Sequence, residues 1–127
     1  MLDVNNFEEL DLSALTNLHS LWVSGNPLSE LDISGNSQLR NLNCANIQIT
    51  SLDVSNNPLI EWIQCSGNGI SSLNLLNNIN LRSLEVNGTD LTSIDLSNNA
   101  NLKYLYIHDN SLTGIDLSLS LIHISEP

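Results

Sequence analysis

The sequence repeats itself every 21 residues, and this repeat restricts the possible folds more than any other feature. The segments that begin at Leu18 and Leu39, "LHSLWVSGNPLSELDISGNSQ" and "LRNLNCANIQITSLDVSNNPL", align their apolar positions without a gap. The same register continues in segments that begin at Ile60, Leu81 and Leu102. Such a period is typical of solenoids, in which each repeat buries its apolar side only against its neighbours.

The repeat also defines the domain organisation. Upstream of the first full repeat, "LDVNNFEELDLSALTN" matches the later part of a further repeat. A length of 127 residues with 41% hydrophobic residues suits one domain with a core of its own. We therefore predict one solenoid over residues 1–118, with a partial repeat at 2–17 and repeats from 18, 39, 60, 81 and 102.

Each repeat has two apolar pulses, L-x-x-L-x-(V/C) followed by L-x-x-L-D-(I/V/L). Their alternation predicts short extended segments, because successive side chains of a strand point to opposite faces and neither pulse is long enough for a helix. We expect strands of successive turns to pair in parallel about 4.8 Å apart. The predicted inward residues are Leu42, Cys44, Ile49, Leu52 and Val54 in one turn, and Leu84, Val86, Leu91, Ile94 and Leu96 two turns later.

A column of Asn residues lies between the pulses, at Asn26, Asn68 and Asn110. An inward Asn can bond the backbone groups that a sharp bend leaves free, which are costly to bury alone. Ile47 and Thr89 interrupt the column. These two turns must therefore satisfy their backbone in another way.

The pattern L-x-x-L-x-(L/C)-x-x-N resembles the leucine-rich-repeat signature. The following L-x-x-L-D-(L/V)-S-N-N is similar to the short 21-residue class of bacterial leucine-rich repeats, called IRREKO, which has internalin-like surface proteins as relatives. The resemblance covers Leu2 to Ser118. It implies an open, curved and mainly β solenoid with little or no helix, secretion or display on a bacterial surface, and binding rather than catalysis.

The last residues, "LSLIHISEP" at 119–127, leave the repeat. They resemble the translation of CTGTCTCTTATACACATCTCCGAGCCC, a transposase sequencing adaptor, at every position. We expect this tail to be non-native and residues 1–118 to be a fragment without its caps. The alternative is a capping segment, although this one is apolar rather than polar-faced.

Charge restricts the partners. Fourteen acidic residues against three basic ones give a net charge of -11, which repels nucleic acid and anionic membranes. No apolar run approaches the roughly 18 residues of a membrane span. The first residues, "MLDVNNFEELDL", lack the pattern of a signal peptide. We therefore expect neither nucleic acid binding nor membrane insertion, and we expect a monomer.

The outward positions of the first pulse form the candidate binding face. Four of the five aromatic residues lie there, namely Trp22, Trp62, Tyr104 and Tyr106, whereas Phe7 falls in a core column. The three basic residues, Arg40, Arg82 and Lys103, share one column of this face with His19 and Glu61. Exposed aromatics and Arg dominate interface hot spots, and the resemblance implies ligands on the strand face. The alternative is ordinary surface variation.

The second pulse carries a column of carboxylates at Asp11, Asp32, Asp53, Asp95 and Asp116, with Asn74 as the exception. Stacked carboxylates repel one another, so their repetition needs a reason. Each Asp can accept nearby backbone, Ser or Thr donors in its own turn. The alternative is a row of Ca²⁺ sites, but Ca²⁺ takes about six to eight oxygens and one column supplies too few.

Two cysteines, Cys44 and Cys65, occupy the same inward position on consecutive turns. Directly paired parallel strands rarely offer disulfide geometry, so we expect buried free thiols. His19 and His108 lie on the outer face and could not complete a zinc site with them. We expect no metal and no cofactor.

Catalytic signals are weak. His108 and Asp109 are adjacent on a surface turn without a convergent nucleophile, and Asn87-Gly88-Thr89 matches a glycosylation triplet that is common by chance. We predict a non-enzymatic module that binds a protein or a cell-surface glycan through the strand face. The alternatives are a passive stalk and the recognition arm of a larger secreted enzyme or effector.

Overall fold

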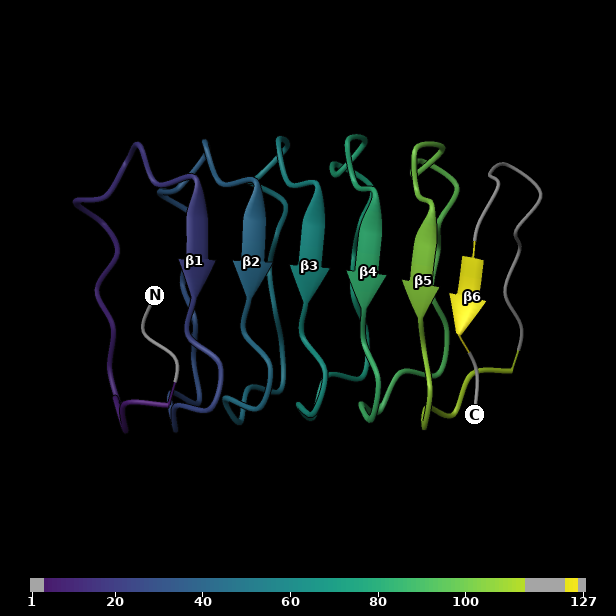
Figure 1. Ribbon diagram of the computed structural model, residues 1–127, viewed down its shortest axis with the longest axis horizontal. Helices are drawn as coiled ribbons and strands as arrows, with labels where there is room; N and C mark the ends of the chain where they lie inside the picture. The colour runs from purple at the N-terminus through teal and green to yellow at the C-terminus, as the bar shows by residue number, and fades with distance from the viewer. Residues whose placement is uncertain (1–3, 114–122, 126–127) are drawn as a thin grey trace.

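The first pulse of each complete turn is a strand of three residues in the computed structural model, which describes residues 4–113 and the backbone of 123–125 (Figure 1). The strands are β1 (Ser20–Trp22), β2 (Asn41–Asn43), β3 (Trp62–Gln64), β4 (Ser83–Glu85), β5 (Tyr104–Tyr106) and β6 (His123–Ser125). They form one parallel sheet in chain order. The part of the chain that the structure describes contains no helix long and apolar enough to cross a membrane. The predicted solenoid of 21-residue turns is confirmed.

The register of the sheet follows the repeat. From β1 to β5 each residue pairs with the one 21 positions later, as Leu21 does with Leu42. Strand β6 departs from this rule, since Leu105 pairs with Ile124, 19 positions later. The rest of the tail at 119–127 lies outside the described residues, and so does Asp116. The adaptor origin of the tail stays a prediction.

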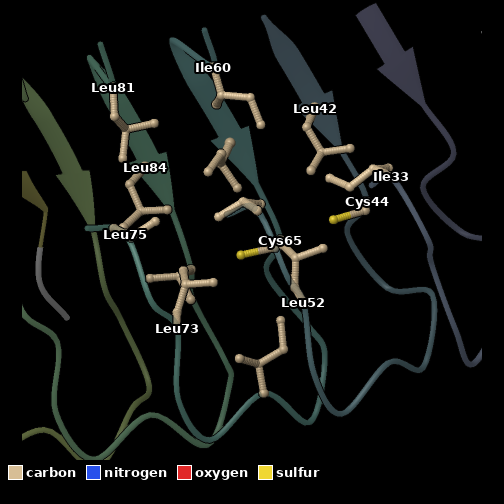
Figure 2. Close-up of a cluster of buried hydrophobic side chains, with 14 of the residues drawn as sticks. Ile33, Leu42, Cys44, Leu52, Ile60, Cys65, Leu73, Leu75, Leu81 and Leu84 are labelled. Atoms are coloured by element: carbon tan, nitrogen blue, oxygen red, sulfur yellow. The ribbon is translucent and has the colours of Figure 1, made fainter. Parts of the chain in front are cut away.

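The inward residues form one continuous core along the solenoid (Figure 2). Nine of the ten predicted inward side chains are buried, and Ile94 is half-buried against them. The prediction for Phe7 was wrong, because its side chain is 37% exposed. Leu28, in the same column, is buried because turns stack on both of its sides, whereas the described structure has a turn on only one side of Phe7.

The second pulse, which we expected to pair in the same manner as the first, forms no strand in residues 4–113. A second column of buried asparagines holds the turns there instead, at Asn36, Asn57, Asn78 and Asn99. Asn57 Nδ2 donates to Ile33 O at 3.0 Å and to Asn36 O at 2.9 Å, both in the preceding turn. Side-chain amides therefore replace part of the backbone ladder. In the sequence these residues are indistinguishable from ordinary turn formers.

The first asparagine column explains how the turns of Ile47 and Thr89 satisfy their backbone. Asn68 Nδ2 donates to Cys65 O of its own turn at 3.0 Å and to Cys44 O of the preceding turn at 2.9 Å. Thr89 bonds Val86 O through its hydroxyl at 3.3 Å and also contacts Asn110 Oδ1. One Asn thus serves two consecutive turns, so the column needs an Asn only at every second turn.

Candidate functional site

The outward side chains of the sheet form three columns, which together are called the strand face. The basic column consists of His19, Arg40, Glu61, Arg82 and Lys103. The leading column consists of Ser20, Asn41, Trp62, Ser83 and Tyr104. The trailing column consists of Trp22, Asn43, Gln64, Glu85 and Tyr106. All seven predicted ligand-binding residues lie in these columns.

A repeated irregularity brings the basic and leading columns to the same side. Arg40 N and Asn41 N both donate to His19 O, at 2.8 and 3.1 Å. The same pattern recurs at β5, where Lys103 N and Tyr104 N both donate to Arg82 O, at 2.8 and 3.1 Å. Two residues facing one partner is the arrangement of a β-bulge, which redirects side chains. Two successive outward side chains therefore precede each inward one.

The aromatic residues gather in two groups on the strand face. Trp22 is 37% exposed, and its ring centroid lies 6.0 Å from that of Trp62 with an interplanar angle of 51°. This spacing lies in the range of favourable aromatic pairs. Tyr104, 45% exposed, and the half-buried Tyr106 lie on the same strand, β5. The face thus presents large side chains at two separate places.

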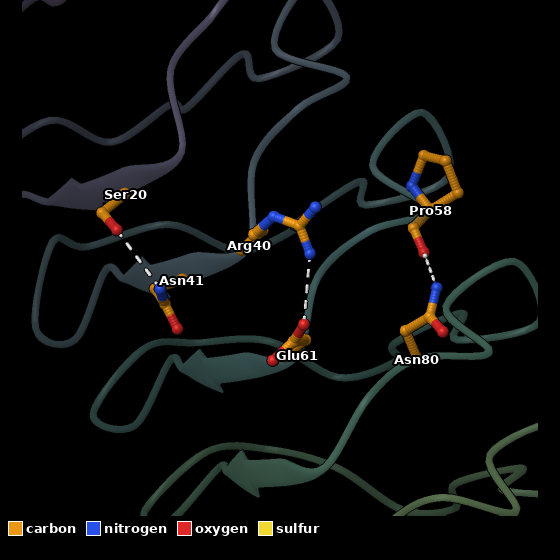
Figure 3. A network of polar contacts seen from close by, with 6 residues as sticks. All are labelled: Ser20, Arg40, Asn41, Pro58, Glu61 and Asn80. Carbon is orange, nitrogen blue, oxygen red and sulfur yellow. Dashed lines mark hydrogen bonds and ion pairs between the residues drawn. The ribbon is translucent and has the colours of Figure 1, made fainter.

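Charged groups on the strand face have specific partners. Arg40 Nη1 lies 3.2 Å from Glu61 Oε1, across consecutive turns, with both side chains partly exposed (Figure 3). Glu85 accepts from Trp62 Nε1 at 3.4 Å and from Gln64 Nε2. In residues 4–113, neither Arg82 nor Lys103 takes part in an ion pair.

Three polar residues belong to the face although sequence reasoning missed them. Glu85 accepts from the Trp62 indole and from Gln64, and Asn41 Nδ2 donates to Ser20 Oγ at 3.2 Å (Figure 3). The signal that could have identified them is the register, because Asn41 and Glu85 stand 21 residues, and Gln64 stands 42 residues, from an outward residue already chosen.

The aspartate column has the local role that we predicted. Asp53 Oδ1 accepts Ser55 N at 2.9 Å and Ser55 Oγ at 2.6 Å, and Asp32 bonds Ser34 in the same way. The Ser55 hydroxyl and its N–H lower the pKa of Asp53, because they stabilise the charged carboxylate. Asn74 Oδ1 accepts Leu76 N at 3.0 Å, so an amide can replace the carboxylate. Within residues 4–113, no three His, Cys, Asp or Glu side chains gather closely enough to hold a metal ion.

The two cysteines are buried free thiols, as predicted (Figure 2). Burial in an apolar core raises the pKa of both, to about 12 for Cys65, because the thiolate is poorly solvated there. Such thiols are poor nucleophiles at neutral pH.

The described surface outside the strand face has few groups that could bind or react with a ligand. Three hollows lie along the second pulse, and one of them is lined by Leu73, Leu76, Ile94 and Asp95 among others. Neither His nor Cys lines any of the three. His108 is half-buried and Asp109 adopts a positive φ of 54° in the bend after β5. The strand face therefore holds all three basic residues of the chain and four of its five aromatic residues.

A parallel solenoid of 21-residue turns with inward Leu and Asn columns is a leucine-rich-repeat fold. The Leucine Rich Repeat family model matches residues 17–39 and 101–121. No curated protein matches the sequence.

Three solved structures are similar to this chain. The functional domain of InlJ from Listeria monocytogenes, which includes a cysteine ladder, is 28% identical over 91% of this chain and 28% of that chain, with a TM-score of 0.83. The internalin InlF of the same species is 27% identical over 89% and 36% of the two chains, with a TM-score of 0.80. A TLR13–ssRNA13 complex is 29% identical over 85% and 17%, with a TM-score of 0.70.

This chain thus spans well under two thirds of each of these proteins. The likeness extends over nearly all of this chain, so the solenoid is internalin-like. A solenoid of this kind offers an extended surface.

Proposed function

We propose that the chain is a non-enzymatic recognition module that binds a protein or a cell-surface glycan through the strand face, in a bacterial secreted or surface protein. The observation that carries this proposal is that the aromatic and basic side chains are concentrated on the strand face. Only 4% of the residues are aromatic and only three are basic, yet Trp22, Trp62, Tyr104, Tyr106 and all three bases lie in three adjacent columns. Random surface variation would also place such residues along the second pulse.

The physical properties of the face support binding. Partly exposed Trp and Tyr side chains supply large contact area with little loss of conformational entropy. Arg40 and Trp62 are already held by Glu61 and Glu85. A face whose side chains are fixed before binding loses less entropy when the ligand arrives. The similarity to internalins supports the bacterial surface context.

Substitution of the aromatic anchors tests the proposal. We expect Trp62→Ala and Tyr106→Ala each to weaken binding to a host cell surface or to a positive member of a glycan panel by about 2 kcal/mol, or roughly thirtyfold in Kd. Ile79→Ala is the matched control, because Ile79 is 56% exposed but lies outside the strand face. Unaltered binding by both anchor variants with an unchanged urea midpoint would refute the assignment of the face.

Two other roles are favoured by the lengths of the similar proteins. This chain spans 28% of one internalin and 36% of another, so each of those proteins extends beyond the part that resembles this chain. It would then serve as a stalk that spaces another domain from the surface, or as the recognition arm of a secreted enzyme or effector. A stalk requires no aromatic face, so the anchor variants separate it from the main proposal.

A further inference from the structure

The positive charges of this chain are confined to one line. Three basic residues stand against fourteen acidic ones, and all three lie in the basic column. Backbone bonds connect the column from turn to turn, since Glu61 N donates to Arg40 O, and Lys103 N to Arg82 O, both at 2.8 Å. The column therefore crosses the strand face from one turn to the next.

The acidic groups of the strand face are already occupied. Glu61 lies 3.2 Å from Arg40, and Glu85 accepts from Trp62 and Gln64. These are the two carboxylates in the three columns between residues 19 and 106. Their engagement leaves Arg82 and Lys103 without an ion pair in the described part of the chain.

Arg82 and Lys103 occupy the same column in two consecutive turns, so they are direct neighbours. Parallel strands lie about 4.8 Å apart, so the two side chains start side by side, and both are exposed. Like charges directly opposite one another on a sheet are destabilising. An anion placed over both cations would remove this repulsion and gain charge-assisted hydrogen bonds from the Arg fork and the Lys ammonium.

We propose that Arg82 and Lys103 form an anion-binding subsite of the strand face, which takes a carboxylate-bearing segment of a protein partner. This inference rests on the proposed function and specifies its chemistry. Tyr104 directly follows Lys103 and is 45% exposed, so an apolar contact accompanies the two charges. Aromatic and Arg side chains together are typical of protein hot spots.

The size of the subsite argues for a short acidic segment rather than a polyanion. Two cations match one or two carboxylates. The remaining charge of the chain, with a net value of -11, repels a long polyanion such as nucleic acid. A short acidic segment gains the local attraction, and salt at physiological strength screens the distant acids beyond about 8 Å.

A peptide titration tests the subsite without the natural partner. The probe is the synthetic peptide acetyl-Glu-Tyr-Glu-amide, added to the ¹⁵N-labelled full chain and followed by amide chemical shifts. We expect saturable shifts at Arg82, Lys103 and Tyr104. The matched peptide acetyl-Gln-Tyr-Gln-amide should bind roughly tenfold more weakly, because hydrogen bonds to charged groups are the stronger ones.

Variants of the chain provide the second part of the test. We expect Arg82→Gln combined with Lys103→Gln to weaken binding of the Glu peptide roughly tenfold or more, and Glu61→Gln to strengthen it by removing the neighbouring negative charge. Leu15→Ala is the control, since Leu15 is 49% exposed but lies outside the strand face, and this variant should leave peptide affinity unchanged. The exposure of Arg82 and Lys103 means that these variants should fold.

Three results would overturn the proposal. They are equal affinity for the Glu and Gln peptides, shifts that localise away from Arg82 and Lys103, and binding of a sulfated disaccharide where the Glu peptide gives no shifts. None of these depends on the aromatic anchors. The proposed binding of a partner through Trp62 can therefore be correct even if the Arg82 and Lys103 subsite is refuted. The subsite can likewise be correct if the role of Trp62 is refuted.

Discussion

Asn68 Oδ1 accepts the backbone N–H of Ile47 at 3.0 Å, and Ile47 is the residue that stands in the same column one turn earlier. The same oxygen accepts Ile49 N at 3.3 Å, while Nδ2 donates to Cys44 O at 2.9 Å. The side chain of one turn thus supplies the polar contacts that an apolar residue cannot make in the previous turn. Neighbouring turns are therefore joined in pairs.

Removal of the Asn68 side chain should destabilise its own turn and the preceding turn together. We expect Asn68→Ala to lower the free energy of unfolding by about 3 kcal/mol, because buried backbone groups in both turns lose their partners. The urea midpoint measures this change. Asn110→Ala, at a half-buried position of the same column, should cost less. A loss at Asn68 smaller than the loss at Asn110 would show that burial does not determine the cost of losing an Asn from this column.

The core column of Cys65 also contains Val23, Cys44, Val86 and Ile107, all buried. We expect Cys65→Val to change the free energy of unfolding by less than about 1.5 kcal/mol, because a similar side chain already fills this position in other turns. Cys65→Ser should cost about 1 to 3 kcal/mol, since it buries a hydroxyl without a matching donor or acceptor. Thermal or urea unfolding of the two variants compares them directly. Equal losses of stability in the two variants would mean that packing, rather than polarity, determines which residues are tolerated at position 65.

Thiol reactivity should report on the same burial. The pKa of Cys65 is raised to about 12, so the folded protein holds almost no thiolate at neutral pH. We expect both thiols to react with a disulfide reagent only as fast as the chain unfolds, and to react at once in denaturing urea. Titration of released chromophore over time measures both rates. Fast labelling of the folded chain would show that the core opens locally around Cys44 and Cys65.

Acid should weaken the turns that contain the Asp and Ser pairs. Ser34, Ser55 and Ser97 lower the pKa of Asp32, Asp53 and Asp95 below the ordinary value of 3.8, first through the side-chain and then through the backbone hydrogen bond. A lowered folded pKa means that the contribution to stability is complete above 3.8 and is lost as the pH falls through the folded pKa values. We therefore expect the urea midpoint to fall as the pH is lowered from about 4 to about 2.

Replacing the carboxylates separates their charge from their hydrogen bonds. In the variant with Asp32→Asn, Asp53→Asn and Asp95→Asn, the amides can still accept the Ser N–H, as Asn74 accepts Leu76 N at 3.0 Å. The urea midpoint of this variant should depend less on pH over the same range. An acid dependence equal to that of the parent chain would place the titrating groups elsewhere.

The sequence predicted the fold because one period governs every level of the structure. The inward positions of one turn identify those of the next, so Leu42 and Leu84 could be placed without coordinates, as could the outward columns with Arg40 and Trp62. Contacts between turns were not predictable, because the period says nothing about where a side chain points along the solenoid axis. Asn57 looked like a turn former yet bonds the preceding turn, and Glu85 holds Trp62 across adjacent strands.

The bend after each first pulse requires a left-handed backbone, and this requirement can be tested at Gly88. The position has a φ of 60° at Gly88 and 55° at Asn46, which stands two turns earlier in the same column. Gly and Asn tolerate this region, whereas a Cβ without a local hydrogen bond costs about 1 kcal/mol or more there. A Cβ added at Gly88 would meet nothing within 4 Å, so Gly88→Ala isolates the backbone cost. We expect Gly88→Ala to lower the free energy of unfolding by about 1 kcal/mol and Gly88→Asn to cost less, measured by urea unfolding. Equal losses in the two variants would mean that the bend does not select its residues by φ.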